Sequence, residues 1–219
     1  MPHDKFHTVH TWVFDLDNTL YPASARLFDQ IEIKMTDYVR RTLGVDEAEA
    51  NHLRGLYWRE YGTTLAGLMQ RHHLDPEPYL DAVHDIDLSH LTHDVALIDA
   101  IAALPGRKIV YTNGSRQHAD NVMAARGLTG LFDARYGVED AGYRPKPEQA
   151  AFERVFALDG LEATGAAMVE DDLRNLAAPA AMGMRTLWVT EAETDTAHDA
   201  DAATDNLTHF LATVNETRT

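Results

Sequence analysis

The chain has 219 residues, no cysteine and a formal net charge of −16, and 45% of its residues are hydrophobic. This length and hydrophobic content fit one compact domain with an insertion, or two small domains, and argue against a disordered chain. The lack of cysteine excludes a disulfide framework, and the negative charge argues against partners that are nucleic acids or anionic membranes.

The amino terminus, MPHDKFHTVH, has neither a charged start followed by an apolar core nor a long apolar stretch. It therefore lacks the pattern of a secretory signal or a membrane anchor. We expect a soluble, cytoplasmic protein. The oligomeric state stays open, and a homodimer is among the options.

The first predicted strand covers residues 9–14, where a β-branched and aromatic run ends at Asp15. Helical periodicity then dominates residues 22–91. A first helix is expected to end at Gly44, and a second to open at the capping residue Asp46. Further helices are predicted at 64–73 and 76–84.

Four more apolar runs predict strands at 108–113, 134–140, 166–172 and 184–190. Helices are predicted between them at 115–126, 147–158 and 173–182. This alternation indicates a parallel sheet covered on both faces. Residues 190–206 are polar and acidic and predict an exposed loop, and a last short helix is expected at about 207–215.

The predicted fold class is therefore α/β, with a parallel sheet as the core and a helical cap inserted after the first strand. The core would comprise residues 1–21 and 92–219, and the cap residues 22–91. The cap would cover the carboxyl edge of the sheet, where open α/β folds bind ligands.

Asp15 and Asp17 directly follow the first strand, in the sequence DLDNT. Residues two apart in an extended chain point the same way, so both carboxylates can face one pocket. In phosphoryl transfer, Asp15 would attack phosphorus, and Asp17 would protonate the leaving oxygen and then deprotonate water. Taken alone, the pair could equally be turn residues and a helix cap.

Three other stretches lie at or after predicted strand ends. YTNGS supplies Thr112 and Asn113, whose hydroxyl, amide and neighbouring backbone N–H groups can bind phosphate. YRPKPE places Lys146 between two prolines, where its ammonium can neutralise Asp15 and the transferred phosphoryl group. Each stretch also has a purely structural alternative. YTNGS could be an ordinary turn with a helix cap, and Lys146 could be a surface lysine in a loop.

MVEDDLRN ends a predicted strand with three consecutive acids, Glu170, Asp171 and Asp172. They would repel one another unless a cation such as Mg²⁺ lies among them, although a solvated acidic loop is the simpler alternative. A shared metal site requires Asp15 and Asp171 to lie close enough to bind one ion.

Together and in this order, DLDNT, TNG, the lysine of RPKPE and EDD resemble the four motifs of the haloacid dehalogenase-like hydrolase superfamily. The resemblance covers nearly the whole chain, including the helical insertion, which is similar to the small cap of that family. FDLDNTLYP, YGTTLAGL, YTNGSRQHADNVMAARGL and EDDLRN resemble the pyrimidine 5′-nucleotidase group more than other branches.

The resemblance implies a Rossmann-like core and a Mg²⁺-dependent phosphomonoesterase. Asp15 would be the nucleophile and a metal ligand, and Asp17 the acid and base, which also binds the metal through its backbone carbonyl. Thr112, Asn113 and Lys146 would bind phosphate, Asp171 would be the firmest metal ligand and Glu170 would assist it, while Asp172 stands where the group often has serine. The expected substrate is a small phosphorylated metabolite, with pyrimidine nucleoside 5′-monophosphates as the leading class.

Several alternatives stay open. A phosphatase or mutase acting on another metabolite, such as a sugar phosphate, would use the same residues, and a catalytically silent binding module would use only the cap groove. A haloacid dehalogenase needs neither Asp17 nor the acids at 170–172. In the cap, Tyr57, Trp58, Tyr61 and Leu68 could contact a base or sugar, although such residues more often form a core. The twelve histidines show no metal-ligand spacing and are treated as ordinary polar residues.

Overall fold

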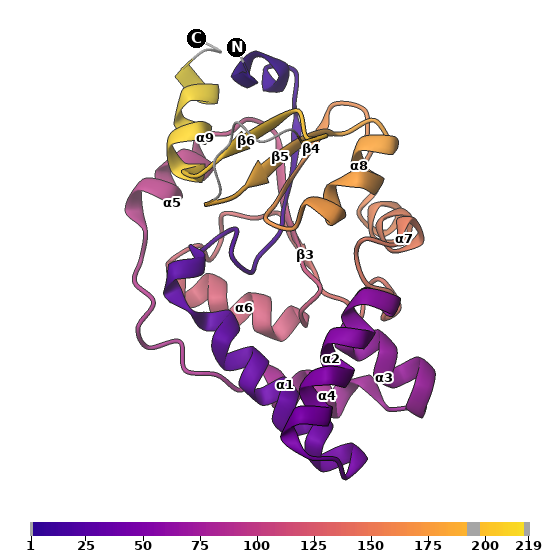
Figure 1. Ribbon diagram of the computed structural model, residues 1–219. Coiled ribbons are helices and arrows are strands. Elements are labelled where there is room, and N and C mark those ends of the chain that lie inside the picture. The colour runs from indigo at the N-terminus through magenta and orange to yellow at the C-terminus, as the bar shows by residue number, and fades with distance from the viewer. Residues whose placement is uncertain (1, 192–197, 217–219) are drawn as a thin grey trace.

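The computed structural model describes residues 2–191 and 198–216. Within these residues, parallel strands form a 6-stranded sheet in the order β3-β2-β1-β4-β5-β6 (Figure 1). The predicted parallel α/β fold is confirmed. The strands are β1 (Thr11–Phe14), β2 (Arg107–Tyr111), β3 (Ala134–Tyr136), β4 (Ala166–Glu170), β5 (Arg185–Val189) and β6 (Ala202–Thr204).

Helices cover both faces of the sheet, because side chains of each strand alternate between two hydrophobic clusters. In β1, Trp12 and Phe14 belong to one cluster and Val13 to the other. The first face is covered by α5 (Val95–Ala102), α6 (Arg116–Arg126) and α9 (Leu207–Glu216), together with the 3₁₀ helix η1 (Pro2–Phe6). The second is covered by α7 (Gln149–Asp159), η3 (Leu173–Leu176) and α8 (Ala177–Ala181).

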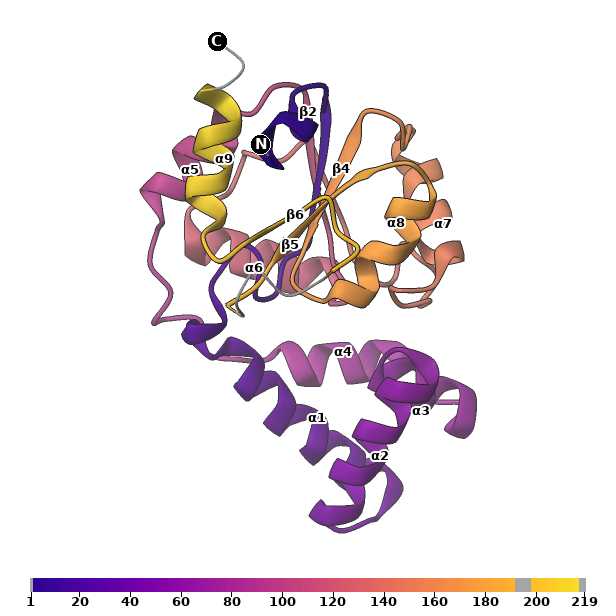
Figure 2. The ribbon, with the colours of Figure 1, turned by 45° about the horizontal axis from the view of Figure 1, so that its top comes forward.

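Four helices between β1 and β2 form a separate group below the carboxyl edge of the sheet (Figure 2). They are α1 (Leu27–Leu43), α2 (Glu47–Tyr61), α3 (Thr64–His72) and α4 (Pro76–His84), preceded by η2 (Ala23–Ala25). Their apolar faces share a hydrophobic cluster that includes Ile31, Val39 and Leu68, and Val138 of the core also contributes to it. Asp46 caps α2 as predicted, since its side chain accepts a hydrogen bond from the Glu49 N–H. The exact division into a core and a cap stays a prediction.

The structure differs from the sequence-based expectation at the carboxyl-terminal end. Part of residues 190–206, predicted as a loop, forms β6, which pairs with β5; residues 192–197 lie outside the described residues. Asp201 fixes this strand, because its carboxylate accepts from the Thr186 N–H at 3.1 Å while its own N–H donates to the Thr186 hydroxyl at 3.0 Å. Helix α5 was not predicted, and the helix expected at 173–182 is divided into η3 and α8.

No helix of the described residues combines the length and the apolar character required to cross a bilayer.

Packing of α2 against α3 depends on Gly67. A Cβ atom at this position would lie 2.3 Å from Cγ of the buried Tyr57 ring. We expect Gly67→Ala to lower the free energy of unfolding by about 1–3 kcal/mol, the usual cost of overpacking. Gly55→Ala is the matched control, because its Cβ would meet only the flexible Arg59 side chain at 3.3 Å. Urea unfolding that shows equal stability for both variants would contradict this packing argument.

Candidate active site

The candidate site lies at the carboxyl edge of the sheet, beside the central strand β1. Asp15 follows β1 directly, Thr112 follows β2, and Glu170 is the last residue of β4. Because β1 lies between β2 and β4 with parallel pairing on both sides, these three residues leave the sheet at the same edge. The loop before α7 adds Lys146.

Lys146 joins these segments through its ammonium group, and the residue is only 1% exposed. Its Nζ donates to Asp15 Oδ1 at 2.6 Å, to Glu170 Oε1 at 2.7 Å and to the Tyr111 carbonyl at 3.1 Å. Burial acts to lower the pKa of Lys146, but the charges of Asp15 and Glu170 outweigh it and raise the pKa. The lysine is therefore held in its charged form.

Asp15, Glu170 and Asp171 form an acidic cluster, in which one carboxylate oxygen of each lies within 4.8 Å of the others. Burial raises the pKa of Asp15, and the charge of Glu170 raises it further. Burial likewise raises the pKa of Asp171, and the charge of Asp15 adds to this effect. Lys146 supplies a single positive charge for three acids, so a hard divalent cation with oxygen ligands, such as Mg²⁺, fits the cluster.

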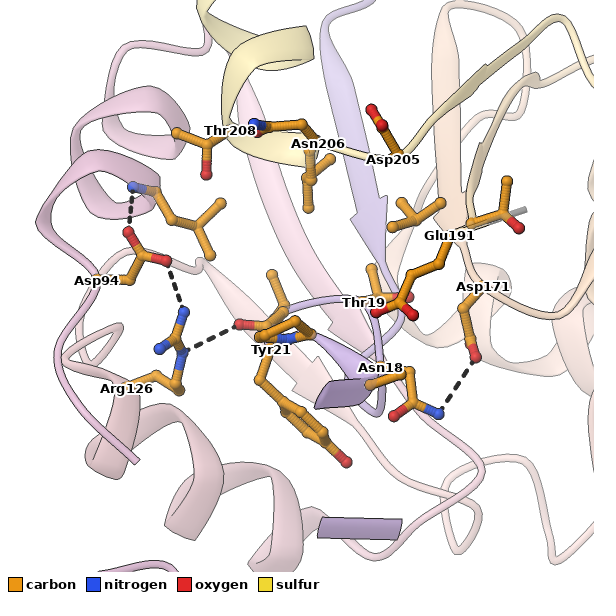
Figure 3. Close-up of a pocket in the computed structure, with 17 residues that line it drawn as sticks. Asn18, Thr19, Tyr21, Asp94, Arg126, Asp171, Glu191, Asp205, Asn206 and Thr208 are labelled. Atoms are coloured by element: carbon orange, nitrogen blue, oxygen red, sulfur yellow. Dashed lines mark hydrogen bonds and ion pairs between the residues drawn. The ribbon is translucent and has the colours of Figure 1, made fainter. Parts of the chain in front are cut away.

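Neighbouring groups fix the orientation of the carboxylates in this cluster. Glu170 accepts from Asn175 Nδ2 at 2.6 Å and from the Asp172 N–H at 2.9 Å. Asp171 accepts from Asn18 Nδ2 at 3.4 Å (Figure 3). The cluster is thus held by the loops after β1 and β4.

Asp17 has different surroundings, because its carboxylate makes contacts outside the acidic cluster. Its Oδ1 accepts from the Tyr21 hydroxyl at 2.7 Å and lies 2.8 Å from His118 Nε2. Burial acts to raise the pKa of Asp17, but the charge and hydrogen bond of His118 outweigh it and lower the pKa to about 2. Asp17 is therefore ionised in this structure.

The predicted phosphate-binding residues Thr112 and Asn113 lie beside the cluster, but their side chains are engaged. The Thr112 hydroxyl accepts from the Gly114 N–H at 2.9 Å. Asn113 holds the backbone of Lys146 at both ends, because Oδ1 accepts from its N–H at 2.8 Å and Nδ2 donates to its carbonyl at 3.1 Å. The structure thus gives Asn113 a part in placing Lys146 that the sequence did not indicate, and phosphate binding by both residues stays a prediction.

Asp172, whose role the sequence left open, caps η3 and pairs with Arg174 at 2.6 Å. The Arg174 guanidinium in turn lies 3.7 Å from the ring centre of Trp58 on α2. On the other side of the site, Gly62 lies against Pro145 and the Lys146 carbonyl, within 3.6 Å of an added Cβ. The segment between Trp58 and Gly62 therefore contacts both loops that carry the acids and the lysine.

A cavity of about 480 Å³ opens beside this segment, between α1, α2 and the start of α3. Two partly exposed aromatic residues, Phe28 and Trp58, line it together with Met35 and Arg54. Arg54 donates to Glu32, Thr36 and Asn51, while its buried Nε has no hydrogen-bond partner among the described residues. The cavity thus offers aromatic surface to a ligand.

A second cavity, of about 450 Å³, borders the loop after β1 (Figure 3). Arg126 of α6 anchors this loop, because it donates to the Leu20 carbonyl at 3.3 Å and to the Thr92 carbonyl at 2.8 Å. It also pairs with Asp94 at 2.7 Å. Arg126 thereby helps to fix the loop that carries Asp17.

Sequence reasoning missed Tyr21, Asn175, His84 and His118. His118 is 101 residues from its partner Asp17, so no local spacing could indicate the contact. The histidines were treated as ordinary polar residues, whereas His118 is buried against the site. One local pattern could have indicated that His118 lies near the site. This residue is in the first turn of the helix that directly follows TNGS, which contains predicted site residues.

The chain matches known proteins both in sequence and in fold. A sequence model of haloacid dehalogenase-like hydrolases matches residues 9–183. Phosphate metabolism protein 8 of Saccharomyces cerevisiae is 27% identical over 190 residues, which cover 78% of this chain. The chain spans only 58% of the length of this curated relative.

Two solved structures share the fold at low sequence identity. Magnesium-bound YfnB from Bacillus subtilis has a TM-score of 0.61 and 16% identity, with 94% of this chain and 99% of that chain covered. L-2-haloacid dehalogenase from Xanthobacter autotrophicus has a TM-score of 0.57 and 16% identity, with 94% and 98% covered.

The crowding of the acidic cluster predicts that Mg²⁺ stabilises the protein. Ligand at ~100 times its Kd adds about 2.7 kcal/mol of stability, which corresponds to about 5–10 °C in Tm for a chain of this size. Thermal unfolding should show this shift for the wild type and not for Asp171→Asn. Asp172→Asn is the matched control and should keep the shift, because Asp172 pairs with Arg174 outside the cluster. A full shift in Asp171→Asn would contradict the assignment of the cluster as a metal site.

Proposed function

The chain belongs to the haloacid dehalogenase-like hydrolase family, and we propose that it is a Mg²⁺-dependent phosphomonoesterase that acts through an aspartyl-phosphate on Asp15. The observation that carries the proposal is the contact of one buried ammonium, Lys146, with both Asp15 and Glu170, beside Asp171. This arrangement supports Asp15 as a carboxylate nucleophile, because it has a positive charge beside it and further acids that can hold a cation. In the proposal, residues 22–91 act as the cap.

In the first step, an oxygen of Asp15 attacks phosphorus and the bond from phosphorus to the ester oxygen breaks. Its electron pair stays on the leaving oxygen, which takes a proton from Asp17. Because Asp17 is ionised in this structure, it must gain that proton before the step. Lys146 holds Asp15 in place and offsets negative charge on the phosphoryl group.

In the second step, Asp17 takes a proton from water, and the water oxygen attacks the phosphorus of the aspartyl-phosphate. The bond from phosphorus to the Asp15 oxygen breaks, which releases inorganic phosphate and restores the carboxylate. When bound by Asp15, Glu170, Asp171 and the Asp17 carbonyl, Mg²⁺ supplies positive charge that offsets the repulsion between the carboxylate and the phosphate.

Pyrimidine nucleoside 5′-monophosphates are the proposed substrates. The cavity beside α2 supports this choice, because Trp58 and Phe28 are 48% and 38% exposed and can stack on a flat ring. Of the other cap residues considered from the sequence, Tyr57 and Leu68 are buried in the hydrophobic cluster of α1–α4.

Asp15→Asn should abolish phosphate release, because an amide oxygen is a poor nucleophile, while the similar shape should leave the protein folded. The measurement is phosphate release from a panel of phosphomonoesters with Mg²⁺, alongside the circular dichroism spectrum. Asp29→Asn, at an exposed position on α1, is the control and should retain activity. Substantial turnover by folded Asp15→Asn would refute its role as the nucleophile. A product that is isomerised rather than dephosphorylated would indicate a mutase.

Trp58→Ala should lower kcat/KM for uridine 5′-monophosphate. It should change kcat/KM for ribose 5-phosphate, which has no base, by no more than about twofold. Loss of aromatic stacking costs about 1–3 kcal/mol, or roughly 5-fold to 150-fold. Trp58→Phe should recover most of the loss in kcat/KM. Ile33 is an exposed apolar residue of α1, and Ile33→Ala should change kcat/KM for neither substrate. An equal fall for both substrates would remove the support for a nucleotide substrate while leaving the phosphatase assignment intact.

A further inference from the structure

His118 connects the predicted acid, Asp17, to a helix of the cap. The His118 side chain is 1% exposed and comes from α6, whereas Asp17 follows β1. An ionised carboxylate can only accept a hydrogen bond, so the Nε2 that lies 2.8 Å from Asp17 Oδ1 carries the hydrogen. The other ring nitrogen, Nδ1, is buried without a hydrogen-bond partner among the described residues.

Both partners of the Asp17 carboxylate bind the same oxygen. Tyr21 and His118 each contact Oδ1, and no hydrogen bond to Oδ2 is formed within the described residues. Two contacts on one oxygen fix the rotation of the carboxylate and leave Oδ2 available to exchange a proton with a leaving group or water. Tyr21 is on the same loop as Asp17, so His118 is the partner that ties this rotation to another element.

His84, the last residue of α4, holds the His118 ring in turn. The two rings stack at 4.3 Å with an interplanar angle of 13°. His84 Nδ1 also lies 3.1 Å from the hydroxyl of Ser115, which caps α6 by accepting from the His118 N–H. Because His118 Nδ1 has no partner of its own, the orientation of its ring depends on Asp17 and on this stack.

Gly114 shows how closely these rings pack over the loop after β2. A Cβ at Gly114 would lie 3.1 Å from His118 Cδ2 and 3.3 Å from His84 Nε2. Such contacts are tight, so the two rings occupy the space that a side chain at position 114 would need.

We propose that His118 is a positioning residue, which holds Asp17 Oδ1 so that Oδ2 faces the reacting groups, and that His84 keeps His118 in place while α4 contacts α6. The inference rests on the proposed phosphatase function. It makes proton transfer by Asp17 dependent on the docking of the cap helix α4. A buried histidine with a purely structural role would instead affect every substrate alike.

The test compares two esters that differ in their need for an acid. The alkyl leaving group of uridine 5′-monophosphate needs a proton, whereas p-nitrophenolate departs without one. Comparing kcat/KM isolates the first chemical step from hydrolysis of the aspartyl-phosphate. We expect His118→Ala to lower kcat/KM for uridine 5′-monophosphate about tenfold or more relative to kcat/KM for p-nitrophenyl phosphate. Complete loss of general acid catalysis, about 10²-fold to 10⁴-fold, is the upper limit of this difference.

Further variants separate positioning from simple damage to the fold. His118→Gln should recover part of the loss, because its amide can donate to Asp17, and His84→Ala should show the same substrate dependence to a smaller degree. In the Asp17→Asn background, His118→Ala should have little further effect, since both changes remove one function. His52→Ala, on the exposed side of α2, is the control and should match the wild type.

The outcomes distinguish this inference from the proposed function. Equal losses on both esters, or losses that add fully to those of Asp17→Asn, would overturn the positioning role while the active wild type upholds the phosphatase. If His118→Ala does not fold, the values of kcat/KM for the two esters are compared in His84→Ala and His118→Gln instead, and this comparison tests the positioning role. A folded wild type that is inactive on both esters with Mg²⁺ would overturn the proposed function and this inference together.

Discussion

The candidate site depends on one buried ion cluster, in which the Lys146 ammonium contacts Asp15 and Glu170. These residues come from three distant parts of the chain, so the cluster also joins the loops after β1 and β4 to the loop before α7. Removing one partner from a buried ion pair typically costs about 3–5 kcal/mol, because a charge is left uncompensated. The acids still outnumber the lysine, so the cluster carries excess negative charge that a bound cation would offset.

The strand order explains why this cluster can form. With β1 between β2 and β4, the loops that follow these strands meet at one edge. Asn113 then places Lys146 by binding its backbone, and Arg126 anchors the loop of Asp17. Helices α1–α4 contact this edge through Trp58, Gly62 and His84.

The two aspartates after β1 differ because their surroundings differ. Burial and the nearby Glu170 raise the pKa of Asp15, while His118 lowers that of Asp17. Environments that push the pKa values of two neighbouring acids apart are a general means of giving them different chemical roles. The roles proposed here need the opposite protonation states, because a nucleophile must be ionised and an acid must carry a proton. Positive charge beside Asp15 and protonation of Asp17 before the first step are therefore requirements of the proposed mechanism.

The sequence by itself determined the parallel α/β fold, the helical insertion after β1, the acids at strand ends and the lysine in the loop before α7. These depend on local signals, namely apolar runs, caps and residues that end a strand, which are readable within a few positions. Strand β6 and the contacts of His118, Asn113 and Asn175 were decided only by the tertiary structure. Strand β6, His118 and Asn113 depend on partners far away in the chain, such as Thr186 for Asp201 or Asp17 for His118, and a single sequence carries no local pattern for such contacts. Asn175 contacts Glu170 only five residues away, but this contact depends on the turn between β4 and η3.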